Sequence, residues 1–208
     1  MSIIGTFNNW NIVAVPSYPP PRTQQFTAND IVGMNVSPFT GQQQTLDWQS
    51  GWLEVQVSYQ PLTRQQAQAW QAFLMQLRGQ ANVFQMGDAL ATSPQGSHPG
   101  TPLVNGANQT GYSLATDGWT ANATNILLPG DWIQIGYRLY KVLDAANANA
   151  SGQATLNLWP QLRESPADNT ALTLTNTKGL FRLKGNARQW SLVEDKTCGI
   201  QFEAREAL

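Results

Sequence analysis

The stretch Trp52-Leu53-Glu54-Val55-Gln56-Val57-Ser58-Tyr59 decides the fold of the first half of the chain, because its side chains alternate between apolar and polar. A period of two places the apolar side chains on one face and predicts a half-buried β-strand. Pro61 cannot donate to a sheet ladder, so we expect the strand to stop before it. The segment 52–59 is therefore predicted to cover a core with one face.

An amphipathic helix is predicted directly after this strand. Thr63 can cap the free backbone N–H groups of a helix start, and Gln66 can reach back to it, which is a capping box. Arg78, near the negative helix end, and Gly79, in a left-handed cap, are expected to close the helix. The apolar residues at helical spacing are Ala67, Trp70, Phe73, Leu74 and Leu77. With another strand over 82–86, the pattern predicts one helix laid on a sheet, with the two aromatic residues as anchors.

The rest of the chain is predicted to be mostly β. Before the helix, apolar runs indicate two short strands within 1–15, then a strand, a loop over 37–44 and a strand within 26–52. Gly, Pro, Ser and Thr dominate 91–108, which predicts a long loop or a crossing between domains. From there to residue 160, turns separate short apolar runs at a spacing typical of a small barrel or sandwich. The predicted class is mainly β with one packed α-helix, an α+β fold.

Low charge is the main compositional signal. Only 12% of the residues are charged, against roughly 25% in ordinary soluble domains, while 41% are hydrophobic. This composition favours a protein that buries much of its surface against neighbours, although a β-rich extracellular protein can share it. The net charge is −1 and no basic stretch occurs, so sequence-independent nucleic-acid binding is not expected.

Cysteine content and hydropathy indicate the compartment. Cys198 is the only cysteine, so no disulfide within the chain is predicted. No apolar run reaches the length of a membrane span, and the first residues lack the basic and apolar regions of a secretory signal. We therefore expect a protein made and folded in a cytoplasm, without membrane insertion.

Few residues offer catalytic or metal-binding chemistry. His98 is the only histidine, so a Ser-His-Asp or Cys-His site would need it, and nothing around His98 or Cys198 indicates activation. One histidine and one cysteine also leave few ligands for zinc. Asp117 and Asp131 lie beside glycine in predicted turns, where aspartate is typical for backbone reasons. We predict no catalytic residue, no metal, no cofactor and no enzymatic activity, with an opposed carboxylate pair of glycosidase type left open.

The tryptophans allow two interpretations. Exposed aromatic rings stack on sugars, which would suit a carbohydrate-binding module. Buried rings anchor cores and protein interfaces, which is the interpretation that we favour. The eight residues are Trp10, Trp48, Trp52, Trp70, Trp119, Trp132, Trp159 and Trp190.

Several motifs, in this order, resemble those of a known family. Among them are Ser37-Pro38-Phe39-Thr40-Gly41-Gln42-Gln43, Val83-Phe84-Gln85-Met86-Gly87-Asp88, Gly130-Asp131-Trp132-Ile133-Gln134 and Trp159-Pro160-Gln161-Leu162-Arg163. The other matching segments are 51–52, 61–79, 139–142, 179–183 and 202–207. Together they cover nearly the whole chain and resemble the distal tail proteins of long-tailed bacteriophages, or siphophages.

The resemblance implies a fold and a structural role. It implies a tail-tube-like β-sandwich with a flanking helix, formed by 1–88 and 166–208, and a small inserted β-barrel or sandwich domain over 89–165. Such proteins form a homohexameric ring at the virion tail tip and leave a channel through which genomic DNA passes. The implied partners are further copies of the chain, the tail-tube protein, the tail-tip hub or baseplate protein and the tape measure protein.

Two other functions stay open at this stage. One is a carbohydrate-binding or host-recognition module of a tail tip, although the chain leaves less room for a separate glycan-binding domain than its larger relatives have. The other is a cell-wall hydrolase. For the ring, we predict that Arg182, Lys184 and Arg188 do not form a continuous band on the channel wall, because a basic lining would hold DNA.

Overall fold

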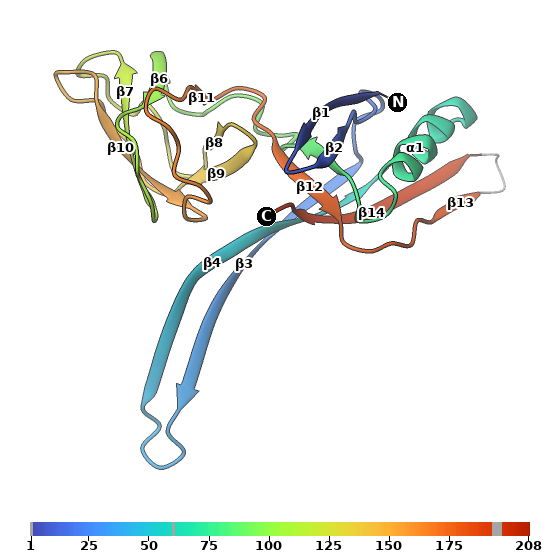
Figure 1. Ribbon diagram of the computed structural model, residues 1–208, viewed down its shortest axis with the longest axis horizontal. Coiled ribbons are helices and arrows are strands. Elements are labelled where there is room, and N and C mark those ends of the chain that lie inside the picture. Colours follow the sequence, from blue (N-terminus) through green and yellow to red (C-terminus); the bar gives the residue numbers. More distant parts are fainter. Residues whose placement is uncertain (1, 60, 193–196) are drawn as a thin grey trace.

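In the computed structural model, which describes residues 2–59, 61–192 and 197–208, β-strands dominate the chain (Figure 1). Strand residues make up 46% of it, about twice the share in ordinary soluble proteins. The described residues contain one α-helix and two sheets, one of them nearly barrel-shaped. The prediction of a mainly β fold with one packed helix is confirmed at this level.

The large sheet runs in the order β1-β2-β5-β12-β14-β4-β3, and β13 pairs with β14 beside this path. All its pairings are antiparallel except that of β2 with β5. Asn8 and Asn9 join the first two strands with positive φ angles, as a tight hairpin turn requires. Its strands are β1 (Ile3–Phe7), β2 (Trp10–Val13), β3 (Thr23–Val36), β4 (Gln43–Ser58), β5 (Val83–Met86), β12 (Gly179–Leu183), β13 (Trp190–Leu192) and β14 (Cys198–Glu206). The sequence Trp190-Ser191-Leu192-Val193 predicts a strand, and its last residue, Val193, lies outside the described residues.

Helix α1 (Arg64–Gln76) packs on one face of this sheet, and its buried apolar side chains form part of the core on that face. The predicted capping box is confirmed, because the backbone N–H of Thr63 donates to Oε1 of Gln66 at 3.0 Å. Trp70 is buried, and its ring meets that of Phe73 edge to face with centroids 5.6 Å apart. The predicted end differs, since Arg78 itself takes a left-handed conformation before Gly79 and lies beyond the last helical turn.

The small sheet has the order β11-β8-β9-β10-β7-β6 and surrounds a second core. Its end strands approach each other, since Leu103 bridges Ala171 and the backbone N–H of Val104 donates to the Thr170 carbonyl at 2.9 Å. Its strands are β6 (Gly100–Val104), β7 (Ser113–Trp119), β8 (Trp132–Ile135), β9 (Arg138–Val142), β10 (Ala154–Trp159) and β11 (Leu172–Thr173). Because β11 pairs with β8, the small sheet extends beyond residue 165, where the sequence placed the end of the inserted segment.

Two local predictions are wrong for backbone reasons. The sequence Thr116-Asp117-Gly118-Trp119 predicts a turn. These residues instead belong to β7, where Gly118 has a φ of +77° and lies against the Thr101 carbonyl. The predicted loop 91–108 contains strand β6, which pairs with β7 through a register shift. Irregular pairing with glycine at special φ angles therefore looked like a turn in the sequence.

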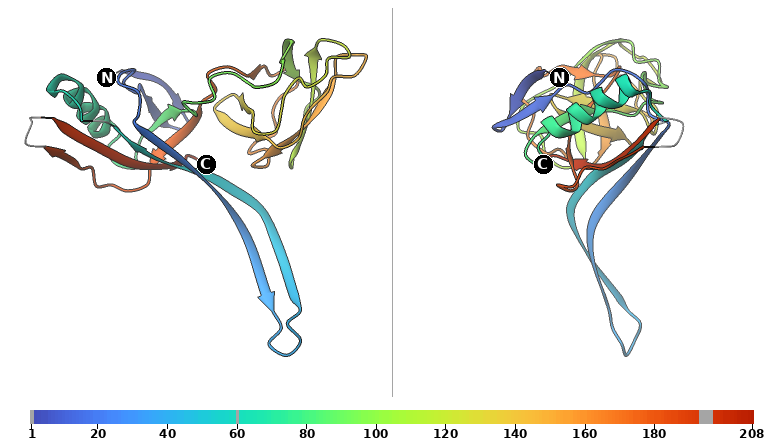
Figure 2. Two further views of the ribbon diagram at one scale, coloured as in Figure 1. Left: turned by 180° about the vertical axis from the view of Figure 1, so that it is seen from behind. Right: turned by 90° about the vertical axis from the view of Figure 1, so that its right-hand side faces the viewer.

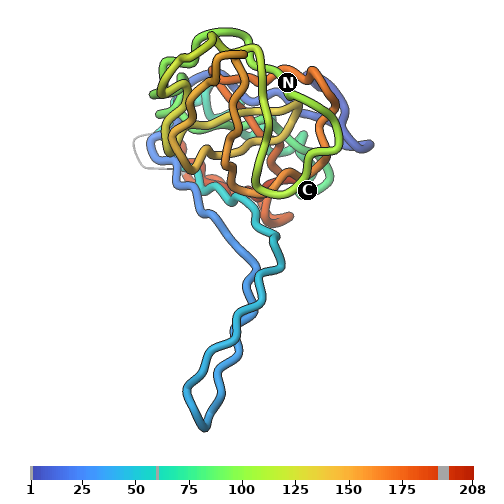
Figure 3. Tube along the Cα trace, turned by 90° about the vertical axis from the view of Figure 1, so that its left-hand side faces the viewer, coloured from blue at the N-terminus to red at the C-terminus, as the bar shows by residue number. Residues whose placement is uncertain are grey.

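The most prominent feature is the hairpin of β3 and β4, which projects far from the body (Figures 1 and 2). The two strands pair from Thr23↔Ser58 out to Val36↔Gln43, with one irregularity between Asp30 and Val32. Figure 3 shows the pair leaving the body as a single twisted projection. The sequence predicted three strand segments here, whereas β4 is continuous from Gln43 to Ser58.

Candidate assembly interface

We call the outer part of this hairpin, residues 30–50, the arm. Beyond its root it projects away from the rest of the described chain in Figures 1 and 2. Phe39 at the tip is 95% exposed, and Trp48 near the root is 63% exposed. The exposed large apolar residues of the arm are Ile31, Val32, Met34, Val36, Phe39, Leu46 and Trp48. Such a set in a single projection marks an interaction surface.

Apolar side chains occupy both faces of the arm. Val32, Met34 and Val36 alternate along β3 and so share one face. On the other face, Gly33 pairs with Leu46, and a Cβ at Gly33 would lie 3.8 Å from Nε1 of Trp48. Neither face of this two-stranded ribbon has a core to cover it.

An isolated two-stranded ribbon is only marginally stable in water. The outer edges of this one are also unprotected, because β3 and β4 contain no Lys, Arg or Pro, the residues that commonly block pairing with another chain. A covering partner would satisfy both the apolar faces and the free backbone edges. The arm therefore has the chemistry of a protein–protein interface.

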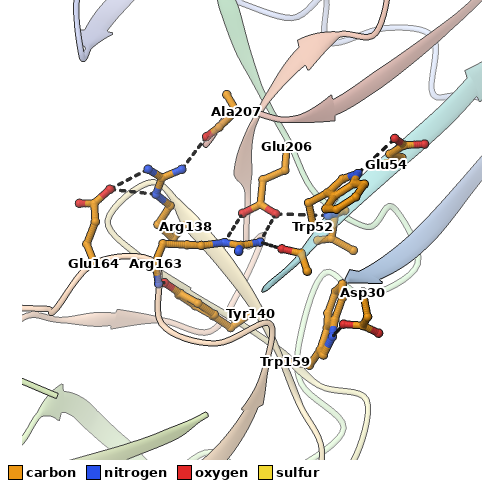
Figure 4. A network of polar contacts seen from close by, with 12 residues as sticks. Asp30, Trp52, Glu54, Arg138, Tyr140, Trp159, Arg163, Glu164, Glu206 and Ala207 are labelled. Carbon is orange, nitrogen blue, oxygen red and sulfur yellow. Dashed lines mark hydrogen bonds and ion pairs between the residues drawn. The ribbon is translucent and has the colours of Figure 1, made fainter. Parts of the chain in front are cut away.

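The root of the arm is fixed by a buried ion pair that joins the two sheets (Figure 4). Arg163, just after β10, contacts Glu206 of β14 at 2.7 Å, with side chains only 9% and 4% exposed. The same guanidinium donates to the Gly51 carbonyl of β4. Oε2 of Glu206 accepts the backbone N–H of Leu53 at 3.2 Å. We call Arg163 and Glu206 the latch, because they tie the small sheet to the strand that carries the arm.

Further contacts strengthen this junction. Nε1 of Trp159 donates to Asp30 on β3 at 2.8 Å, directly at the arm root. Arg138 pairs with Glu164 at 2.7 Å and donates to the Ala207 carbonyl at 2.5 Å. The small sheet therefore holds both strands of the hairpin where the arm leaves the body.

A cationic group lies on the large-sheet face away from α1. Arg182 of β12 and Lys184, the residue after it, alternate with Phe181 and Leu183, which are buried in the core. Lys184 contacts the Glu54 carboxylate at 2.9 Å, which lowers the pKa of Glu54. Arg188, the third basic residue singled out in the sequence, lines a groove beside β13 and β14 that Lys184 also borders.

The residues considered for catalysis or metal binding make contacts that support the fold. Nδ1 of His98 lies 2.7 Å from the Gly96 carbonyl in the small domain, whereas Cys198 is buried in the core beneath α1. Asp131 is 3% exposed and accepts the backbone N–H of Leu128 at 2.8 Å and of Gln95 at 2.7 Å. It organises two loops, as its turn position predicted.

Within residues 2–59, 61–192 and 197–208, no three His, Cys, Asp or Glu side chains are grouped to hold a metal ion. In that same part of the chain, no helix is long and apolar enough to cross a membrane. Trp48 and Trp190 are the most exposed of the tryptophans, while Trp70, Trp119 and Trp132 are buried in the cores.

Comparison with known proteins assigns no family to this geometry. No protein-family model matches the chain, and no curated protein matches it.

Sequence reasoning missed the latch as an interaction. Arg163 and Glu206 lie in two of the segments that carry the family resemblance, but their partnership joins positions 43 residues apart. Isolated charges in a chain with few charged residues are the signal that could have marked them. The exposed arm also escaped prediction, since its apolar residues resemble those of ordinary buried strands.

Proposed function

We propose that the chain is a structural protein that forms a ring at the distal end of a phage tail, joining the tail tube to the tail-tip hub. The observation that carries this proposal is the arm, a long ribbon with uncovered apolar faces and a fixed root. The resemblance to distal tail proteins supports the same role. In this proposal the large sheet with α1 is the tail-tube-like ring-forming domain, and the small sheet is the inserted domain.

The exposed apolar surface of the arm limits how the copies can associate. Complete burial of one large apolar side chain stabilises by about 1.5–3 kcal/mol. The arm's seven such side chains are about half exposed, so covering all of them yields roughly 5–10 kcal/mol. Association costs at least about 4 kcal/mol in lost freedom, so one arm contact gives only weak pairing. A closed head-to-tail ring, in which every copy gives and receives an arm, gains from each contact.

The proposal is tested by shortening the arm. Val32 and Asp47 are register partners, so replacing residues 33–46 by Asn-Gly leaves a two-residue hairpin between them. Native mass spectrometry and negative-stain imaging of the full-length chain, at several concentrations, should show closed hexamers with a central hole. The shortened chain should remain monomeric with an unchanged near-UV circular dichroism spectrum of its cores.

A matched control separates apolar contact from general disturbance of the arm. Gln42→Ser with Gln44→Ser changes polar arm residues and should leave assembly intact, while Met34→Ser with Trp48→Ser should weaken it. A full-length chain that stays monomeric at its highest soluble concentration, alone and with a tail-tube protein, would contradict the proposal. If the full-length and shortened chains assemble equally well, the arm takes no part in assembly and that part of the proposal is wrong.

One observation favours a second candidate, a carbohydrate-binding module of a tail tip. Trp48 and Trp190 are 63% and 45% exposed, and exposed indole rings can stack on sugars. Glycan-array binding by the monomeric shortened chain, lost in Trp190→Ala, would support this candidate.

The channel prediction remains part of the proposal. Arg182, Lys184 and Arg188 are expected to stay off a continuous band on the channel wall, because clustered cations would retain DNA. A cryo-electron microscopy map of the ring tests it, and a closed circle of these side chains around the pore would refute it.

A further inference from the structure

Two arginines lie directly opposite each other on the large sheet. Arg182 of β12 and Arg205 of β14 are register partners, so their side chains leave the same face. Like charges at such positions repel each other, which makes the pair unfavourable unless an anion lies nearby. Among the described residues, neither arginine has an ion pair within 4 Å.

Each guanidinium lies over the face of an indole ring. Arg182 lies 4.2 Å from the ring centroid of Trp10, and Arg205 lies 4.4 Å from that of Trp52. A cation–π contact of this kind holds the guanidinium in place without using its N–H groups, which can still bind an anion. Within the part of the chain that the structure describes, Nε and Nη2 of Arg182 are enclosed and have no hydrogen-bond partner, and burial lowers the pKa of Arg182. These two donors are therefore unsatisfied, and an anion reaches them only if the side chain shifts.

The nearby carboxylates are already engaged. Glu54, the register partner of Arg205, binds Lys184 at 2.9 Å and the indole N–H of Trp52 at 3.1 Å. Glu206 is occupied by the latch, at 2.7 Å from Arg163. Glu203, two residues before Arg205 on β14, lies 3.7 Å from the Lys184 ammonium. The carboxylates of this face therefore pair with Lys184 or belong to the latch, and neither Arg182 nor Arg205 has one as an ion-pair partner among the described residues.

A cavity of about 300 Å³ lies between these side chains. Arg182, Arg205, Lys184 and Glu54 line it, together with residues at the end of β14. Its volume corresponds to about ten water molecules, which leaves room for a carboxylate side chain. Glu206 lines it as well, so three cationic side chains share the cavity with two carboxylates that are already engaged. The cavity thus combines space for an anion with an excess of positive charge.

The arm carries the matching charge. β3 and β4 contain three acids and no base. Asp30 accepts from Trp159, and Glu54, inward of the arm on β4, pairs with Lys184. Exposed Asp47 accepts the backbone N–H of Gln49 at 2.7 Å and has no other hydrogen bond or ion pair to a described residue. Asp47 is therefore the carboxylate of the arm that remains available to another molecule.

We propose that Arg182 and Arg205 bind the Asp47 carboxylate from the arm of a second copy of this chain. This contact rests on the proposed ring and specifies where each arm lies in it. Apolar contacts alone do not determine how the arm is aligned on its partner. A complementary charge pair fixes this register and disfavours wrong partners.

Charge reversal tests the contact in the full-length chain. Asp47→Lys and Arg205→Glu should each weaken assembly by about tenfold or more in sedimentation and native mass spectrometry, as expected for inverting one side of an interfacial charge pair. The double variant, in which the charges are exchanged, should recover most of that loss. Arg188→Glu makes the same charge change outside the cavity and should assemble as the unmodified chain does.

Photo-crosslinking gives a second measurement that does not depend on Arg205 variants folding. A benzophenone side chain at position 47 should crosslink to the segments 182–184 and 203–205 of a neighbouring copy. If rings form but position 47 crosslinks to other segments, the proposed contact is wrong. The same holds if rings form and the charge-exchanged double variant recovers no assembly. In both cases the proposed ring itself is not contradicted. A chain that never assembles would overturn both proposals.

Discussion

Breaking the latch should destabilise the whole molecule, because it leaves one charge buried without a partner. Arg163 and Glu206 are 9% and 4% exposed and lie 2.7 Å apart. Glu206→Gln keeps the volume and a carbonyl oxygen for the Leu53 N–H, so it removes the charge and little else. Removing one partner of a buried ion pair typically costs about 3–5 kcal/mol.

The double variant tells a specific pair from a general disturbance. Arg163→Met alone should cost a similar amount, since it leaves the Glu206 carboxylate without its guanidinium. Arg163→Met with Glu206→Gln leaves no unpaired charge, although the Gly51 carbonyl loses a donor, which costs about 1–3 kcal/mol. The double variant should therefore lose clearly less than the sum of the single losses.

Urea unfolding followed by tryptophan fluorescence and far-UV circular dichroism measures these losses. The comparison holds where the dependence of the unfolding free energy on urea stays the same in all variants. Lys184→Met, which breaks the exposed ion pair with Glu54, serves as the control and should shift the midpoint far less. Single losses below about 1 kcal/mol, or strictly additive losses, would refute the view that this pair joins the two sheets.

Three smaller changes test the packing, the surface charge and the helix start. Gly87→Ala should cost at least about 2 kcal/mol in urea unfolding, because the added Cβ would lie 1.8 Å from a backbone carbonyl oxygen, while Gly185→Ala, with nothing within 4 Å, should stay within about 0.5 kcal/mol. The hydrogen bond from Lys184 lowers the pKa of Glu54, so the stability from this contact is present above the ordinary glutamate pKa of about 4.3 and is lost as the pH falls through the lowered value. Lys184→Met should therefore raise the Glu54 pKa in a carboxyl NMR titration, and an unchanged value would contradict the contact. Gln66→Ala removes the acceptor at the helix start and should cost about 0.5–1 kcal/mol by the same urea assay.

Local sequence patterns correctly predicted the start of the helix and the inner half of β4. The capping box at Thr63 and Gln66 formed as expected, because its two members lie within one helical turn. The alternation in 52–59 predicted the inner half of β4 correctly, because that half has one buried face. Both signals report contacts between residues that are close in the chain or share one core.

The arm and the latch could not be predicted from local sequence patterns. Between Asp30 and Gly51 neither face of the hairpin is buried, so the usual alternation is missing and β4 looked interrupted. The latch depends on Arg163 meeting Glu206, and only the folded arrangement of the two sheets brings them together. The cationic pair of Arg182 and Arg205 likewise depends on strand register, which is set by sheet topology.

The fixed root determines how the uncovered ribbon can bind another copy of the chain. A ribbon on a loose root would lose much of its binding free energy to ordering, since each immobilised chain segment costs entropy. Here Arg163 and Trp159 hold β4 and β3 where they leave the body, so the direction of the arm is set before any partner arrives. Ring closure requires the same angle at every contact, because a varying angle produces open chains of copies. Loosening the latch should therefore impair closure before it abolishes contact between copies, which gives open oligomers in negative stain where the intact chain gives rings.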